Sequence, residues 1–462
     1  MAEFSRRTKD VNILTGDPKK AIVAMIVPIT IALVIQTLNN MIDSVWVAGL
    51  GSTALAAVGV VFPIFFILVA IGNGIGIGAS QAIARRIGAK DTEGADKAAV
   101  QGVMLTIAAG VIMTVVLFIA APYILAAIGG ADYLDECLAY AYPVILGCIV
   151  FFMSGYLTNL LRSEGAAKRS MNIQILAAAI NIVLDPIFIY IFGWGLMGAA
   201  VATLLAMFIS LLICVYWYKI KKDTYLKLSF SGFRFDRVIC KDIFSVGLPA
   251  AMEMLLISVT SMIMNIIVVG VGGTDGVAIF TSAWRIINML MIPMMAVSQA
   301  MVPVCAASYG ARRVDRIDTA YKYAVKLILL VMIAITAVTL IFAPQICVMF
   351  TYSDNTAGLR DGMVEMLRIM VLALPLMGLG FVSSGFFQAL GMGMKSLIST
   401  LFRNLLQIPI CIYLATFGIL SYIWVGAATA EIFGSVVMGF WGFLLLKYML
   451  REWKSHGGSP AE

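Results

Sequence analysis

Twelve stretches of the chain are apolar over about 20 residues, the length that an α-helix needs to cross the hydrocarbon core of a bilayer. Of the 462 residues, 61% are hydrophobic and 12% are charged, whereas soluble domains carry about 25% charged residues. The pattern predicts an all-α, polytopic membrane protein with twelve transmembrane helices. They are expected near residues 21–48, 54–82, 98–124, 137–161, 170–192, 197–218, 243–270, 277–306, 321–344, 364–388, 396–418 and 422–446.

Basic residues indicate how these helices are oriented. If the N-terminus is cytoplasmic, all 32 Lys and Arg residues except Arg285, Arg360 and Arg368 fall on the cytoplasmic side. This distribution satisfies the positive-inside rule. We therefore expect a multi-pass protein with both termini in the cytoplasm. The first 20 residues have no apolar core and no small-residue cleavage site, so they do not resemble a signal peptide.

Composition argues against several classes of function. The net charge of +7 is explained by the cytoplasmic segments, and nucleic-acid binding, which needs a clustered basic face, is not expected. The seven cysteines form no Cys-x-x-Cys pair, which argues against a disulfide framework or a zinc site. The single histidine, His456, lies in the polar tail, and no convergent nucleophile, base or metal motif is found. We expect no enzyme activity and no cofactor.

The two halves of the sequence resemble each other. An offset of 221 residues pairs Pro28 with Pro249 and Gly49 with Gly270, and later motifs pair at offsets of 226 to 228. Because each half has six predicted spans, both copies have the same orientation, which predicts two six-helix lobes related by a parallel repeat. The expected segments are an N-terminal segment 1–20, an N-lobe 21–218, a basic linker 219–242, a C-lobe 243–448 and a cytoplasmic tail 449–462.

Residues 72–80 read GNGIGIGAS, a glycine-rich run inside a predicted span. No strand is predicted before it, so a phosphate-binding loop is not expected. We interpret the run as a surface for close helix–helix packing.

Polar side chains in three predicted spans define a candidate site. Asp43 shares a helix face with Gln36 and Asn40, at spacings of i+7 and i+3, and Asn39 lies at the edge of that face. Asp185 has Asn181 one turn before it, and Thr203 has Ala199 one turn before it. Orientation and spacing place Asp43, Asn181, Asp185 and Thr203 at a similar depth, in the outer half of the membrane.

An intramembrane acid usually marks an ion path, a proton relay or a substrate cavity, because burying its charge costs about 2.5–3.5 kcal/mol on insertion scales. The site offers oxygen atoms alone, which suits Na⁺ or a proton better than a transition metal. A hydrogen-bonded network that only fixes helix packing is the structural alternative. The repeat offsets pair Asp43 with Met264 and Asp185 with Cys411, so coupling is expected in the N-lobe.

The second half has its own intramembrane acids, Glu253 and Glu431. Either could be a counter-charge for a transported substrate or a partner for a neighbouring polar group. The sequence leaves both interpretations open.

With these features the chain resembles the MATE (multidrug and toxic compound extrusion) family over nearly its whole length, and most of all its prokaryotic DinF-like branch. The resemblance rests on Pro28, Gln36 and Asp43, on the twelve-span plan, and on RSEG at 162–165, NIVLDP at 181–186 and GAAVAT at 198–203. It implies antiport of Na⁺ or H⁺ against amphiphilic, often cationic, drug-like molecules in a prokaryotic plasma membrane, without a resident cofactor.

The resemblance also implies roles for individual residues. Asp43, Asn181, Asp185 and Thr203 would bind Na⁺ or H⁺, Gln36 and Tyr140 would support that network, and the first span would bend near Pro28. NorM-like members carry a further acid where this chain has Ile257, so a C-lobe cation site of that type is not expected. We expect a monomer. The alternative function is a lipid or lipid-linked-sugar flippase with a similar two-lobe fold.

Overall fold

The structure is a computed structural model that describes residues 8–348, 351 and 358–455, and within these residues it contains helices and no strand. His456 lies outside the described residues. The chain divides into two compact units, Met1–Ala251 and Met252–Glu462. The division falls inside α9, so the basic linker and the first turns of that helix pack with the first unit, beyond the predicted boundary at 243.

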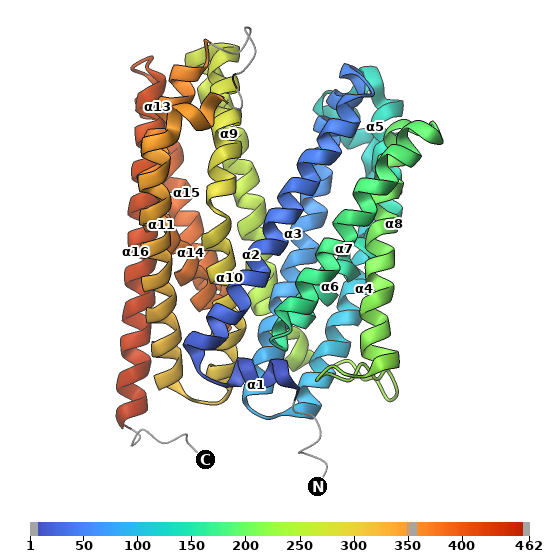
Figure 1. Ribbon diagram of the computed structural model, residues 1–462, viewed down its shortest axis with the longest axis vertical. Coiled ribbons are helices and arrows are strands. Elements are labelled where there is room, and N and C mark those ends of the chain that lie inside the picture. Colours follow the sequence, from blue (N-terminus) through green and yellow to red (C-terminus); the bar gives the residue numbers. More distant parts are fainter. Residues whose placement is uncertain (1–7, 349–350, 352–357, 456–462) are drawn as a thin grey trace. The chain divides into compact units, whose positions relative to one another are not determined.

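In the first unit, long helices run side by side and α1 lies across one end of them (Figure 1). Capping side chains fix two of the starts: Asp17 accepts hydrogen bonds from the backbone of Lys19 and Lys20 before α2, and Asp91 accepts one from Gly94 before α4. The elements are α1 (Lys9–Thr15), α2 (Pro18–Ala48), α3 (Ser52–Gly88), α4 (Thr92–Leu125), η2 (Ala126–Gly130), η3 (Ala131–Tyr133), α5 (Leu134–Leu146), α6 (Cys148–Ser163), α7 (Ala167–Pro186), η4 (Ile187–Ile191), α8 (Gly195–Val215) and η5 (Tyr216–Lys221).

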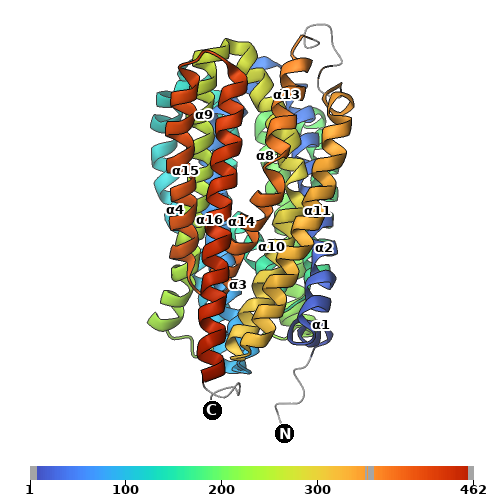
Figure 2. The same cartoon turned by 90° about the vertical axis from the view of Figure 1, so that its left-hand side faces the viewer.

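The second unit repeats the pattern of long, closely packed helices. Its last two helices, α15 and α16, lie side by side (Figure 2). The elements are α9 (Arg237–Leu290, whose first turns belong to the first unit), α10 (Ile292–Gly310), α11 (Val314–Val348), α13 (Arg360–Val371), α14 (Leu374–Ala389), α15 (Gly393–Ala415) and α16 (Leu420–Ser455).

The described helices agree with the predicted membrane crossings. Ten are long and apolar enough to span a bilayer, and two bent pairs, α5 with α6 (54°) and α13 with α14 (52°), raise the number to as many as twelve. Prolines lie at these breaks. Pro143 precedes the bend between α5 and α6 by one turn, and Pro375 is in the first turn of α14. In the same way, Pro293 is in the first turn of α10, just after the end of α9. Within α9, Gly273 has φ 57° and separates two predicted spans.

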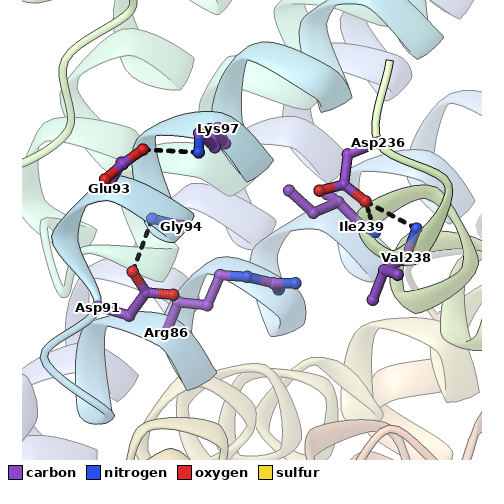
Figure 3. Close-up of a pocket in the computed structure, with 8 residues that line it drawn as sticks. All are labelled: Arg86, Asp91, Glu93, Gly94, Lys97, Asp236, Val238 and Ile239. Atoms are coloured by element: carbon purple, nitrogen blue, oxygen red, sulfur yellow. Dashed lines mark hydrogen bonds and ion pairs between the residues drawn. The ribbon is translucent and has the colours of Figure 1, made fainter. Parts of the chain in front are cut away.

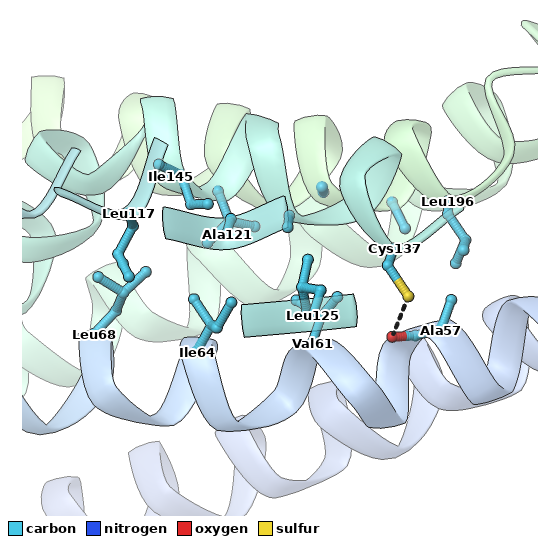
Figure 4. Close-up of a cluster of buried hydrophobic side chains, with 14 of the residues drawn as sticks. Ala57, Val61, Ile64, Leu68, Leu117, Ala121, Leu125, Cys137, Ile145 and Leu196 are labelled. Carbon is cyan, nitrogen blue, oxygen red and sulfur yellow. Dashed lines mark hydrogen bonds between the residues drawn. The ribbon is translucent and has the colours of Figure 1, made fainter. Parts of the chain in front are cut away.

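Both sides of the long helices are apolar, which is the expected condition of a protein surrounded by lipid. On α4, Ile112, Val116 and Ile119 are 60%, 52% and 65% exposed along one stripe. The opposite stripe, Leu117, Ala121 and Leu125, is buried against α3 and α5 (Figure 4).

The glycine-rich run on α3 packs closely against other helices, as predicted. A side chain at Gly74 or Gly78 would overlap the backbone of α9 near Gly247 and Ile243, and one at Gly76 would meet Asn159 of α6. The absence of a Cβ therefore sets the distance between α3 and its neighbours.

The linker lies on the first unit, at the same end as α1 (Figure 1). Glu164, between α6 and α7, accepts hydrogen bonds from Tyr218 Oη (2.6 Å) and from the backbone of Tyr225 (2.7 Å). Arg169 on α7 forms an ion pair with Asp223 at 2.8 Å. Burial raises the pKa of Glu164 to about 7, although its hydrogen bonds act to lower it.

Candidate functional site

Asn181 connects three helices of the first unit. Its Nδ2 donates to Asp185 Oδ1 (2.9 Å) on α7 and lies 3.2 Å from Thr203 Oγ1 on α8. Its Oδ1 accepts from Asn39 Nδ2 on α2 at 2.8 Å. Asn181 and Asp185 are 3% and 1% exposed. Polar side chains of the predicted spans 21–48, 170–192 and 197–218 therefore lie together, as the sequence predicted, and Asn181 is at the centre of the group.

Asp43 joins this network beside Asp185. The two carboxyl groups are close enough to hydrogen bond to each other. Asp43 Oδ1 and Asp185 Oδ2 are enclosed, and neither has a hydrogen-bond partner among the described residues. Two carboxylates in contact repel each other unless they share a positive charge. These two oxygens therefore fit a bound proton or a small monovalent cation.

Thr203 and Ala199 interact with each other on α8. The Thr203 hydroxyl donates to the Ala199 carbonyl at 3.1 Å, within one helical turn. A sodium ion bound by both oxygens would have to displace this hydrogen bond, whereas a proton between the two aspartates would leave it intact.

The structure corrects part of the predicted supporting network on α2. Asn39, placed at the edge by the sequence, donates directly to Asn181, whereas Gln36 and Asn40 are exposed and form no side-chain hydrogen bond to the site in the described part of the chain. Asn40 is rotated by about 100° from Asn39 on the helix, and Gln36 lies two turns from Asp43. Asn39 also shares a face with Asp43, at a spacing of i+4, and the packing of α2 against α7 decides that this residue and not Asn40 reaches Asn181.

Tyr140 on α5 lies next to the acidic pair, where both carboxyl charges act on its hydroxyl group. Its ring also packs against the apolar core of the first unit. Its supporting role, which the resemblance implies, stays a prediction.

Pro28 lies inside α2, and the helix continues through it. A proline has no backbone N–H, so the carbonyl one turn earlier lacks its usual donor at this level. The predicted hinge has this local weakness, and in the structure α2 is a single α-helix from Pro18 to Ala48.

The two acids of the second unit differ in their surroundings. Glu431 is 6% exposed and forms an ion pair with Arg403 at 3.1 Å, which matches the local-partner interpretation. Glu253 Oε2 is 3.4 Å from Ser384 Oγ, which in turn lies 2.6 Å from Ser396 Oγ. Its Oε1 is enclosed without a partner among the described residues. The serines were not predicted, because single serines in a span carry no distinctive sequence signal.

A separate hollow of about 310 Å³ lies at the end of the first unit near the linker (Figure 3). The charged residues around it already have partners within the protein. Arg86 forms an ion pair with Asp242, and Lys97 forms one with Glu93. Asp91 and Asp236 accept hydrogen bonds from backbone N–H groups in the first turns of α4 and α9. This composition does not favour an amphiphilic ligand.

The MatE family model matches the chain twice, over residues 28–187 and 249–413. The chain belongs to the MATE family. The two matches begin at Pro28 and Pro249, the prolines that the internal repeat pairs. As a member of this family, the chain is a multi-pass membrane transporter and not an enzyme.

Curated relatives and solved structures resemble this MATE protein over nearly its whole length. The multidrug export protein MepA of Staphylococcus saprophyticus is 25% identical over 438 residues, 92% of each chain, and MepA of Staphylococcus aureus strain NCTC 8325 is 25% identical over 422 residues, 88% of this chain and 89% of MepA. A crystal structure of a MATE protein in complex with MaL6 is 38% identical, with a TM-score of 0.94 over 96% of this chain and 100% of the other.

A further solved structure adds a point about the binding pocket. It is a MOP superfamily transporter from Pyrococcus furiosus, 38% identical, with a TM-score of 0.92 over 96% of this chain and 99% of the other. That protein is described as having a binding pocket of reversed polarity that suggests a different function.

Proposed function

We propose that this MATE protein is an antiporter that exports amphiphilic or cationic drug-like molecules and takes up protons in exchange. The observation that supports the proposal most directly is the contact between Asp43 and Asp185, whose enclosed oxygens Oδ1 and Oδ2 have no donor among the described residues. A shared proton removes the repulsion between them without rearranging Thr203 and Ala199. We therefore favour H⁺ over Na⁺ as the coupling ion.

The proton is the second substrate of this cycle. With it bound, one carboxyl group is protonated and donates a hydrogen bond to the other, so the pair of Asp43 and Asp185 carries a single negative charge and holds α2 against α7. When it leaves, two adjacent negative charges remain, which favours separation of α2 from α7 and binding of a cation. A pH unit provides about 1.4 kcal/mol per proton, and a potential of 100 mV about 2.3 kcal/mol per charge. These gradients can drive uphill export by alternating access.

Glu253 is the acid that we assign as a counter-charge for cationic cargo in the second unit. Glu431 is neutralised by Arg403, whereas Glu253 contacts hydroxyl groups and forms no ion pair within the described residues. A buried carboxylate without a cationic partner attracts an ammonium group. We do not assign Glu431 this role.

We further propose that both termini are cytoplasmic and that the transporter works as a monomer. The end of the first unit that holds α1 and the linker also holds Arg85, Arg86 and Arg169. This is the side on which the positive-inside rule places basic residues.

Proteoliposomes test the coupling. Export of a monocationic dye is measured first with an imposed pH gradient and then with an imposed Na⁺ gradient. We expect the pH gradient to drive transport and D43N and D185N to abolish it, with D135N, which changes an exposed acid of α5, retaining wild-type rates. If the Na⁺ gradient alone drives transport, the coupling ion is Na⁺ and not H⁺. Undiminished transport by D43N and D185N would refute the site.

A lipid or lipid-linked-sugar flippase is the alternative function. The polarity reported for the pocket of the Pyrococcus relative makes this alternative worth a direct test. Translocation of a fluorescent lipid in the same proteoliposomes, without dye export, would favour the flippase.

A further inference from the structure

The segment that joins the two halves of the sequence has one side attached to the first unit and one side exposed. Tyr225, Leu226 and Leu228 are buried at 6%, 1% and 9% exposure. The backbone of Lys227 donates to Asp96 on α4 at 2.9 Å. Together with the contacts of Glu164 and Arg169, these interactions hold residues 223–228 in a defined conformation.

The next residues expose three phenylalanines. Phe230, Phe233 and Phe235 are 41%, 36% and 62% exposed, although the segment has no helical structure that would place them toward lipid by periodicity. Large aromatic side chains exposed together usually mark a surface that binds something apolar. Arg234 and Arg237 alternate with them and are also exposed.

Contacts with the neighbouring helix ends place this surface at the depth of the membrane boundary. Lys219 Nζ, in the last turn of η5, lies 4.8 Å from the centre of the Phe230 ring. Ile220 in the same turn is 71% exposed, and Val238 in the first turn of α9 is 69% exposed. Aromatic rings and basic side chains at the ends of spans lie at the level of the lipid headgroups.

The charge of the segment is strongly positive. Residues 219–241 contain seven basic residues and two acids. Asp223 pairs with Arg169 and Lys221, and Asp236 caps α9. The remaining basic residues have no acidic partner within the described part of the chain, and they are Lys219, Lys222, Lys227, Arg234, Arg237 and Lys241.

We propose that Phe230, Phe233 and Phe235, together with Lys219, Arg234 and Arg237, form a binding surface for anionic phospholipid of the cytoplasmic leaflet. The phenylalanines enter the region between headgroups and acyl chains, and the basic groups bind headgroup phosphates. A single-stranded nucleic acid would also meet the charge and could stack on the phenylalanines, but the adjoining helix ends expose the aliphatic side chains of Ile220 and Val238, which match lipid and not nucleic acid. The lipid surface is therefore the better match to both features.

Native mass spectrometry of the purified full-length transporter in detergent tests the proposal. The protein is titrated with phosphatidylglycerol or with phosphatidylcholine of the same chain length. We expect tighter binding of phosphatidylglycerol. R234Q/R237Q is expected to weaken it roughly tenfold or more, because each basic group near an anionic surface adds about fivefold in affinity. F230S/F233S/F235S is expected to weaken binding of both lipids.

R451Q/K454Q is the matched control, because it removes two exposed basic residues at the end of α16. It is expected to leave phosphatidylglycerol binding unchanged. The melting temperature of each variant shows whether it is folded. If R234Q/R237Q unfolds, R234Q and R237Q are measured singly, and if F230S/F233S/F235S unfolds, F235S is measured alone. R234K/R237K, which retains the charge, is expected to retain binding. Equal binding of the two lipids, equal losses in R234Q/R237Q and the control, or competition by an oligonucleotide without lipid selectivity would each overturn the proposal.

Discussion

Asn181 donates a hydrogen bond to Asp185, one turn further along α7, at 2.9 Å, while its carbonyl oxygen accepts from Asn39 at 2.8 Å. A single amide thus holds one acid of the candidate site and ties it to the helix that carries the other, Asp43. The orientation of the acidic pair depends on this neutral residue.

Replacing Asn181 by alanine is expected to reduce dye export by at least tenfold. The change removes contacts to Asn39, Asp185 and Thr203 and leaves buried polar atoms without partners, at about 1–3 kcal/mol each. N40A is the control, because Asn40 is exposed on the neighbouring face of α2. Efflux rates in proteoliposomes compare the two, and equal rates would show that Asn181 does not organise the site.

Glu164 is expected to make the folded protein less stable as the pH rises from about 4.5 to about 7. Its pKa is raised to about 7 by burial, so the folded state keeps a proton that the unfolded state loses near pH 4.5. Stability is therefore highest below this range and falls by about 3 kcal/mol across it. Melting temperatures in detergent should fall more steeply for the wild type than for E164Q, while E136Q, an exposed control on α5, should behave like the wild type.

P28A is expected to raise the melting temperature and slow transport. Alanine supplies the missing N–H to the carbonyl one turn earlier and stiffens α2 where bending is proposed. Pro63 also lies inside a helix, α3, so P63A should stabilise the protein without slowing transport. Similar transport rates for the two variants would argue against a hinge at Pro28.

Gly78 and Gly59 offer a matched pair on α3. A Cβ at Gly78 would overlap the backbone of Ile243 and Gly247, whereas one at Gly59 would meet no atom within 4 Å. We expect G78A to lower the yield of folded protein sharply and G59A to leave it unchanged or slightly higher. Size-exclusion profiles of the two proteins provide the measurement.

Arg403 and Glu431 should show strong coupling in a double-mutant cycle. Removing one partner leaves a buried charge, which costs about 3–5 kcal/mol, whereas removing both is far less harmful. We therefore expect R403Q and E431Q to be less stable than R403Q/E431Q. Additive losses would show that the two residues act independently of each other.

The number of spans and the internal repeat could be predicted because lipid imposes a length and a composition on every crossing. Breaks at Gly273, Pro293 and Pro375 were harder to place, since a proline or glycine permits a bend without requiring one. The meeting of Asp43, Asn181, Asp185 and Thr203 followed from depth and orientation. Which of Gln36, Asn39 and Asn40 reaches the site could not be predicted in this way, because that depends on which face of α2 packs against α7.

The pairing of Glu431 with Arg403 shows the same limit. Glu431 could be recognised as an intramembrane acid, whereas Arg403 was assigned to the cytoplasmic side, and the two residues are 28 positions apart on different helices. No short-range pattern links such residues. Only the packing of α15 against α16 decides that they neutralise each other.

The two copies of the repeat differ at the positions of the candidate site. Where the first copy has Asp185, the second has Cys411, whose thiol donates to the Ile423 carbonyl at 3.7 Å, and where the first has Thr203, the second has the neutralised Glu431. A chain fused from two second copies would keep its helices and its lipid-facing surface but lose the acidic pair. On the proposed function, the two halves therefore share one scaffold but could not exchange roles.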